Sequence, residues 1–62
     1  MTEFAWLIEF PGSRPAWWDG RGPDTGVLDA SDAVRFARKE DAERVLAWIV
    51  TRDGIVTEHG WA

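Results

Sequence analysis

Hydrophobic and polar positions alternate near the beginning of the chain, over residues 3–10. One face of this segment carries only large apolar side chains, namely Phe4, Trp6, Ile8 and Phe10. A period of two residues is typical of a β-strand. The other face also holds Ala5 and Leu7, which predicts a central strand or a strand with one wet face. Pro11 should end it.

Two further segments have a regular pattern. The first has apolar residues at i, i+3, i+4, i+7 and i+8, which are Ala42, Val45, Leu46, Ile49 and Val50. This spacing predicts the main helix, from about Lys39 to Arg52, with Asp53-Gly54 as its C-terminal stop. Residues 55–61 alternate again, which predicts the last strand, from Ile55 to Trp61.

Residues 11–26 interrupt regular structure, because they hold all three Pro and four of the six Gly. Within them, the short run Ala16, Trp17 and Trp18 stands out, and we expect Trp17 and Trp18 to form a short second strand or a bridge beside the first strand. An Asp19-Gly20 turn and a mobile loop over residues 21–26 should follow. Val27 and Leu28 are then expected to return to the core. We interpret residues 11–26 as a functional or mobile loop and not as a linker between domains.

A single helical turn is predicted over residues 32–35, capped by Asp29 or Ser31 and anchored by Phe36. The element order is therefore strand, short strand, helical turn, helix, strand. It predicts an α+β fold in which one main helix packs on a small antiparallel sheet of about three strands, in two layers. Residues 1–62 should form a single domain.

The net charge of the chain limits the classes of molecule that it is expected to bind. Seven Lys and Arg against eleven Asp and Glu give a net charge of -4 and a pI near 4.7. Such a chain should be repelled by nucleic acid and by anionic membranes, which favours protein partners. Phe4–Ile8 is the longest early apolar run, too short for a signal sequence or a spanning helix, and there is no cysteine. We expect a cytoplasmic protein.

Catalytic and cofactor signals are poor. The single histidine, His59, lies in a strand, whereas Ser13 and Ser31 lie in loop or cap positions. The carboxylates at Asp19, Asp24, Asp29 and Asp32 do not follow the calcium-loop pattern. The glycines at 20, 22 and 26 fit neither the dinucleotide fingerprint nor the phosphate loop. We therefore predict no enzyme, no metal and no cofactor.

The chain has more indoles than a small core requires, with five Trp and three Phe. Trp48 lies about 120° or more from the middle of the helix's apolar stripe, so it should face solvent or the margin of the stripe. Arg44 and Arg52 are four residues to either side, which allows cation-π contact. Two readings stay open, a partner-binding Trp48 or an indole folded over arginine stems at the rim of the core.

Trp17 and Trp18 point to opposite faces if the chain is extended, so one indole is left over. With Arg14, Asp19 and Arg21 it would form an interface surface, or it could simply cover the core. Five acids cluster in sequence around the start of the main helix, namely Asp29, Asp32, Glu40, Asp41 and Glu43. They could meet a basic protein, although the interleaved cations favour a solvated, salt-bridged helix face.

Several segments together resemble small uncharacterised proteins of bacteriophages and prophages. They are residues 6–9 (WLIE), 17–21 (WWDGR), 33–43 (AVRFARKEDAE) and 58–61 (EHGW). The resemblance implies a compact α+β domain and no known reaction. Similar small acidic phage proteins include anti-CRISPR inhibitors, which bind host interference complexes and block recognition or cleavage of DNA; this step is an analogy of class.

The leading hypothesis is thus a non-enzymatic protein that inhibits a host nucleic-acid-handling defence complex, such as a CRISPR effector, by direct binding. It would act as a monomer or homodimer, without contacting nucleic acid or membrane. The candidate binding residues are Trp48, Arg44, Arg52, Trp17, Trp18, Arg21, Asp29, Asp32, Glu40 and Asp41. The alternative is a self-associating structural or accessory phage protein, paired through indoles or a sheet edge. A small hydrolase that uses His59 is a third hypothesis.

Overall fold

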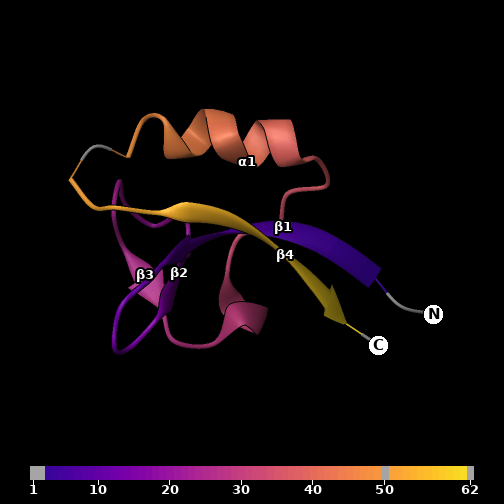
Figure 1. The fold of residues 1–62 in the computed structure, drawn as a ribbon, viewed down its shortest axis with the longest axis horizontal. Helices are drawn as coiled ribbons and strands as arrows, with labels where there is room; N and C mark the ends of the chain where they lie inside the picture. Colours follow the sequence, from indigo (N-terminus) through magenta and orange to yellow (C-terminus); the bar gives the residue numbers. More distant parts are fainter. Residues whose placement is uncertain (1–2, 50, 62) are drawn as a thin grey trace.

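The described residues form one α-helix and one four-stranded antiparallel sheet (Figure 1). The structure is a computed structural model that describes residues 3–49 and 51–61. Its elements are β1 (Glu3–Phe10), β2 (Ala16–Trp18), β3 (Gly26–Val27), a short 3-10 helix η1 (Ala30–Asp32), α1 (Lys39–Leu46) and β4 (Ile55–Trp61). One helix with an antiparallel sheet agrees with the α+β prediction. The sheet has four strands instead of about three, and the two-layer arrangement stays a prediction.

β1 is the strand around which the sheet is built, in the order β3-β2-β1-β4. It pairs with β4 along seven consecutive positions, from Glu3 opposite Trp61 to Glu9 opposite Ile55. Its pairing with β2 covers only Glu9 and Phe10. The predicted bounds of β1 and β4 are confirmed, and the strand or bridge predicted at Trp17 and Trp18 is the strand β2, which begins at Ala16.

Phe36 pairs through its backbone with the part of β1 that β2 does not reach. The N–H of Trp6 donates to the carbonyl of Phe36 at 2.8 Å, and the N–H of Phe36 donates to the carbonyl of Trp6 at 2.9 Å. This isolated antiparallel bridge satisfies both backbone groups of Trp6 on that side. The chain then continues into α1.

The core lies between α1 and one face of β1. Its buried members are Ile8, Phe10, Ala42 and Ile49. Half-buried side chains surround them, namely Trp6, Trp18, Phe36, Val45, Leu46 and Val56. Because Ala42 has a small side chain, the helix can approach the sheet closely at this point. Phe4 shares this face of β1 but is 65% exposed.

The opposite face of β1 is covered as well. Leu7 and Ala5 are buried there, and η1 lies on this side of the sheet, away from α1 (Figure 1). Trp17 of β2 and His59 of β4 also belong to this face, because they pair with odd-numbered residues of β1. The strand order also places β1 between β2 and β4, so of the two predicted alternatives, a central strand and a strand with one wet face, the structure shows the central strand.

The predicted end of the helix at Arg52 is wrong, because α1 ends at Leu46. The next turn is tight: the N–H of Trp48 donates to the carbonyl of Val45 at 2.9 Å, and that of Ile49 donates to Leu46 at 3.0 Å. This turn places the side chain of Ile49 in the core. The chain then returns to the sheet, where β4 begins at Ile55. Val50, another predicted stripe position, lies outside the described residues.

Gly54 therefore lies where the chain passes beneath the end of α1, and it does not form the C-terminal stop of the helix. A Cβ there would lie 2.8 Å from Cδ1 of Leu46 and 3.3 Å from the carbonyl oxygen of Glu9. A larger residue at this position would have to displace the Leu46 side chain, because helix and sheet approach closely here.

Two expectations for residues 27–35 are also wrong. Leu28 is 66% exposed and does not return to the core, since Val27 occupies the half-buried position in β3 and consecutive extended residues point to opposite sides. The helical turn comes earlier than predicted, at Ala30–Asp32, with the Asp29 carboxylate accepting from the Ser31 N–H at 2.9 Å. Val34 is in extended chain, because its N–H donates to the carbonyl of Trp18 at 3.1 Å.

The close approach at Ala42 gives a test of the packing. Replacing this buried residue, Ala42→Leu, should overpack the helix against the sheet and lower the free energy of unfolding by about 1–3 kcal/mol. Each kcal/mol corresponds to a fall in Tm of roughly 4–8 °C in a domain of this size. Thermal unfolding followed by tryptophan fluorescence measures it. Ala47→Leu, at an exposed position beyond α1, is the control; equal losses in both variants would contradict the packing described.

Candidate protein-binding surface

Trp48 is the most exposed large hydrophobic residue among those described. Its exposed fraction is 81%, compared with 65% for Phe4, 66% for Leu28 and 48% for Ile55. The backbone of the turn after α1 fixes this position, since Ile49 enters the core and its neighbour Trp48 points away from it. The predicted exposure of Trp48 is confirmed.

Arg44 and Arg52 do not contact the Trp48 indole in the way that their spacing allowed. Arg44 is exposed in the last turn of α1. Arg52 places its guanidinium carbon 4.2 Å from the centre of the Phe10 ring and donates to the Asp24 carbonyl at 3.1 Å. The end of α1 at Leu46 removes Arg52 from helical spacing with Trp48. The cation-π contacts in the described part of the chain join Arg35 to Trp61, Lys39 to Trp6 and Arg52 to Phe10.

Neither Trp17 nor Trp18 is left exposed. Trp18 stacks on Phe36 with ring centres 6.2 Å apart, and its Nε1 donates to the Gly22 carbonyl at 2.9 Å. Trp17 meets His59 edge to face, with ring centres 5.8 Å apart. Both indoles are half-buried. Trp17 and Trp18 cover opposite faces of the small sheet. Their geometry therefore agrees with the alternative in which the second indole covers the core.

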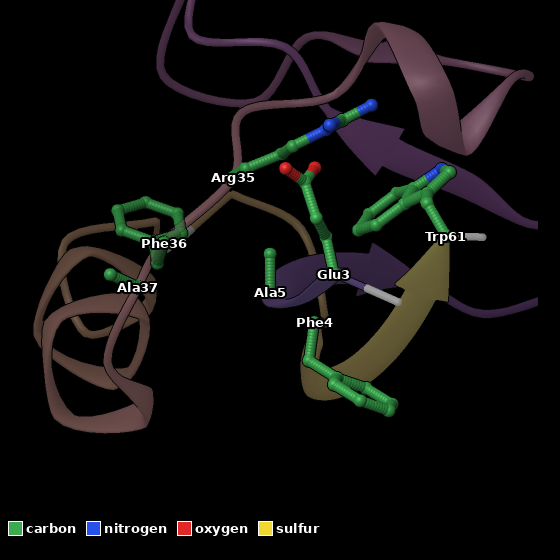
Figure 2. A pocket seen from close by; sticks show the side chains of 7 residues that line it. All are labelled: Glu3, Phe4, Ala5, Arg35, Phe36, Ala37 and Trp61. Carbon is green, nitrogen blue, oxygen red and sulfur yellow. The ribbon is translucent and has the colours of Figure 1, made fainter. Parts of the chain in front are cut away.

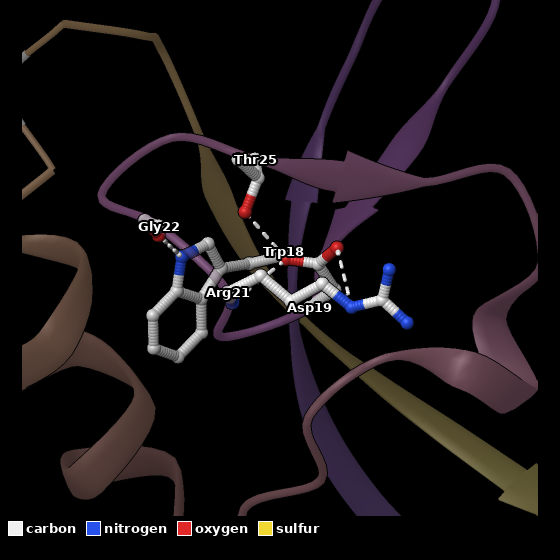
Figure 3. Close-up of polar contacts among 5 residues, drawn as sticks. All are labelled: Trp18, Asp19, Arg21, Gly22 and Thr25. Carbon is white, nitrogen blue, oxygen red and sulfur yellow. Dashed lines mark hydrogen bonds and ion pairs between the residues drawn. The ribbon is translucent and has the colours of Figure 1, made fainter.

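The loop after Trp18 is held in shape by Asp19 (Figure 3). The Asp19 carboxylate accepts from the hydroxyl of Thr25 and from the N–H of Arg21. The Thr25 bond, together with the Arg21 N–H, holds the pKa of this carboxyl below its ordinary value. Further along, the Thr51 hydroxyl donates to Asp24 at 2.9 Å. The Arg21 side chain is 84% exposed at the surface of this ordered loop.

The acidic candidates divide into two groups. Asp29 and Asp32 lie at η1, whereas Glu40 and Asp41 lie in the first turn of α1, on the other side of the sheet (Figure 1). Asp29 is engaged as the cap of η1. These four acids therefore do not form one surface, because the chain crosses the edge of the sheet between them.

Four of the ten candidates belong to one segment, which consists of α1 and the turn that follows it. Glu40 and Arg44 are four positions apart in α1 and therefore lie on the same side of the helix, and the exposed Trp48 lies two residues beyond the end of α1. Asp41 is within about 100° of Glu40 around the helix axis. We call these four residues the helix surface. It combines one highly exposed indole with two acids and one base.

One hollow was not predicted from the sequence. It has a volume of about 390 Å³ and lies between the start of β1, residues 35–37 and Trp61. The Arg35 guanidinium carbon lies 4.0 Å from the centre of the Trp61 ring, and Glu3 extends to the same side (Figure 2). No local pattern in the sequence joins Arg35 to Trp61, because the sheet brings them together.

His59 is packed between aromatic side chains. It lies between Trp17 and Trp61, with ring centres 6.0 Å apart in the second pair, and its Nε2 is 3.1 Å from the Thr57 hydroxyl. Within residues 3–49 and 51–61, no three metal-ligating side chains come together. In the same described ranges, no helix has the length and apolar character needed to cross a membrane.

The hydrogen bonds of Asp19 can be tested through its titration. Thr25→Val removes the hydroxyl donor, so the pKa of Asp19 should rise toward its ordinary value. In the wild type, the ionised carboxylate stabilises the loop above its ordinary pKa, and this contribution is lost as the pH falls through the lowered pKa. Side-chain NMR titration of Asp19 measures the shift. Thr51→Val, which removes a hydroxyl bound to Asp24, should leave it unchanged; the same Asp19 pKa in wild type and Thr25→Val would refute the assignment.

Comparison with known proteins does not place the chain in a family. It matches no protein-family model, no curated protein and no solved structure. The resemblance to small phage proteins therefore stays a prediction.

Proposed function

We propose that this protein is a non-enzymatic binding domain that engages a partner protein through the helix surface. The observation that carries the proposal is the 81% exposure of Trp48 in the turn that follows α1. Tryptophan is enriched among the residues that dominate binding energy at protein interfaces. An indole left outside the core of so small a domain is best explained by a partner that covers it.

The charge of the chain indicates the chemistry of the partner. The net charge is -4, and the helix surface carries Glu40 and Asp41 in the first turn of α1. A partner with a basic surface would be attracted over distances up to about 8–10 Å at physiological salt. Complementary charge mainly raises the association rate, so binding should weaken as salt is added. Arg44 supplies one cation that could pair with an acid of the partner.

In its sharpest form, the partner is a host protein or nucleoprotein complex that handles nucleic acid in defence, and the protein inhibits it as anti-CRISPR proteins do. Such complexes present basic grooves to nucleic acid, and an acidic surface can occupy a groove of this kind. The phage-type resemblance in the sequence supports this form of the proposal. The alternative is a self-associating accessory protein, which would be its own partner.

Affinity capture from a bacterial lysate tests the proposal. The tagged wild type should retain a basic, nucleic-acid-handling complex, and Trp48→Ala should weaken this binding by about 2 kcal/mol or more, roughly 30-fold in Kd. The captured complex, once purified, should lose DNA binding or cleavage when the wild type is added and keep it when Trp48→Ala is added.

Leu28→Ala is the matched control, because it truncates an apolar side chain that is 66% exposed outside the helix surface. Circular dichroism should show that both variants fold. Equal capture by wild type and Trp48→Ala would exclude the helix surface as the binding site. Capture of only the same chain would favour the self-associating alternative.

A further inference from the structure

We infer that the outer edge of β4 is a second binding site, which takes an extended basic segment of another protein as an added antiparallel strand. The site is made of backbone groups around Glu58 and does not use the helix surface. It therefore stands or falls independently of Trp48.

Sheet register shows which backbone groups of β4 point outward. Trp6 directs its N–H and carbonyl toward Phe36, away from β4, so the odd-numbered residues of β1 direct theirs toward β4. Their partners on β4 are also odd-numbered, from Ile55 to Trp61. The remaining residues, Val56, Glu58 and Gly60, therefore direct their N–H and carbonyl groups to the outer side.

This outer side is free over the whole strand as described. β4 stands at the end of the strand order and pairs only with β1, in seven consecutive pairs without a bulge. Among the described residues, no loop backbone bonds to it. Glu58 and Gly60 are exposed, and the strand contains no proline. A row of unpaired backbone groups on a regular strand is a template for a further strand.

The negative charge of Glu58 determines which added strand fits the outer edge of β4. If a second copy paired in the centred antiparallel register, Glu58 would lie directly opposite Glu58 of that copy, and like charges in this position are destabilising. Two copies would also bring together two chains of net charge -4. Shifted registers avoid the direct opposition but shorten the overlap.

A Lys or Arg opposite Glu58 reverses this effect, because opposite charges across strands attract. Glu58 is available for such a pair: the ion pairs within the described ranges join Arg21 to Asp19 and Arg38 to Glu40.

Apolar surface flanks the acid on the same face. Val56 is half-buried two residues before Glu58. Two residues after it, Gly60 has no side chain, and the exposed ring of Phe4 lies over it, with Cε1 3.0 Å from where a Cβ would be. An added strand would therefore find a carboxylate between two apolar contacts. The geometry fits a cationic residue flanked at alternate positions by β-branched or other apolar side chains.

Two synthetic peptides test the inference with the full chain. Each has nine residues of alternating Thr and Val with blocked ends, and the central residue is Arg in one and Glu in the other. NMR titration of the wild type should show tighter binding of the Arg peptide, by about fivefold for one cross-strand charge pair. Hydrogen exchange should slow at the amides of Val56, Glu58 and Gly60, which have no strand partner before the peptide binds.

Glu58→Lys supplies the decisive comparison, since this exposed substitution should reverse the preference to the Glu peptide. Trp48→Ala should bind the Arg peptide as the wild type does, which separates this site from the helix surface. Absence of binding, the same preference in wild type and Glu58→Lys, or protection at other amides would overturn the inference. Concentration-dependent protection of the three amides without any peptide would assign the edge to a second copy instead.

Discussion

The reciprocal backbone pairing of Trp6 with Phe36 determines how the rest of the chain is arranged. β2 reaches only the last two residues of β1, so the polar groups of Trp6 need another partner on that side. Phe36 supplies both a donor and an acceptor. Because η1 precedes this contact and α1 follows it, the chain passes here from one side of the sheet to the other (Figure 1). The crossing separates the acids of η1 from those of α1, and it leaves β4 at the outer edge of the described sheet.

Four of the five indoles compensate for the small core. Each half-buried one packs against a specific neighbour: Trp18 on Phe36, Trp17 on His59, Trp6 under Lys39 and Trp61 under Arg35. Aromatic side chains bury large areas even when one side stays wet. The surplus of tryptophan in the composition is therefore mainly structural, and composition alone overstates how many indoles are free to bind a partner.

Local periodicity predicted the elements that packing does not override. The alternation over residues 3–10 and 55–61 gave the bounds of β1 and β4, because each strand keeps its faces along its whole length. The apolar pattern predicted a helix that continues past Leu46, because Ile49 would face the core in a helix. It faces the core equally in the tight turn that the structure shows. The same periodicity predicted the exposure of Trp48. The partner of Arg52 could not be predicted, because Asp24 lies in a loop that only the tertiary fold brings close.

The geometry of the turn after α1 explains where Trp48 points but not why it is a tryptophan. Ile49 must enter the core, and its neighbour must then face solvent whatever its side chain is. A polar residue would satisfy this backbone equally well and would avoid exposing a large apolar ring. Core stability thus places no requirement on the indole. The same argument applies to the edge of β4, where one acidic side chain limits self-pairing but leaves the backbone open to a basic strand. Both features are better explained by binding than by folding.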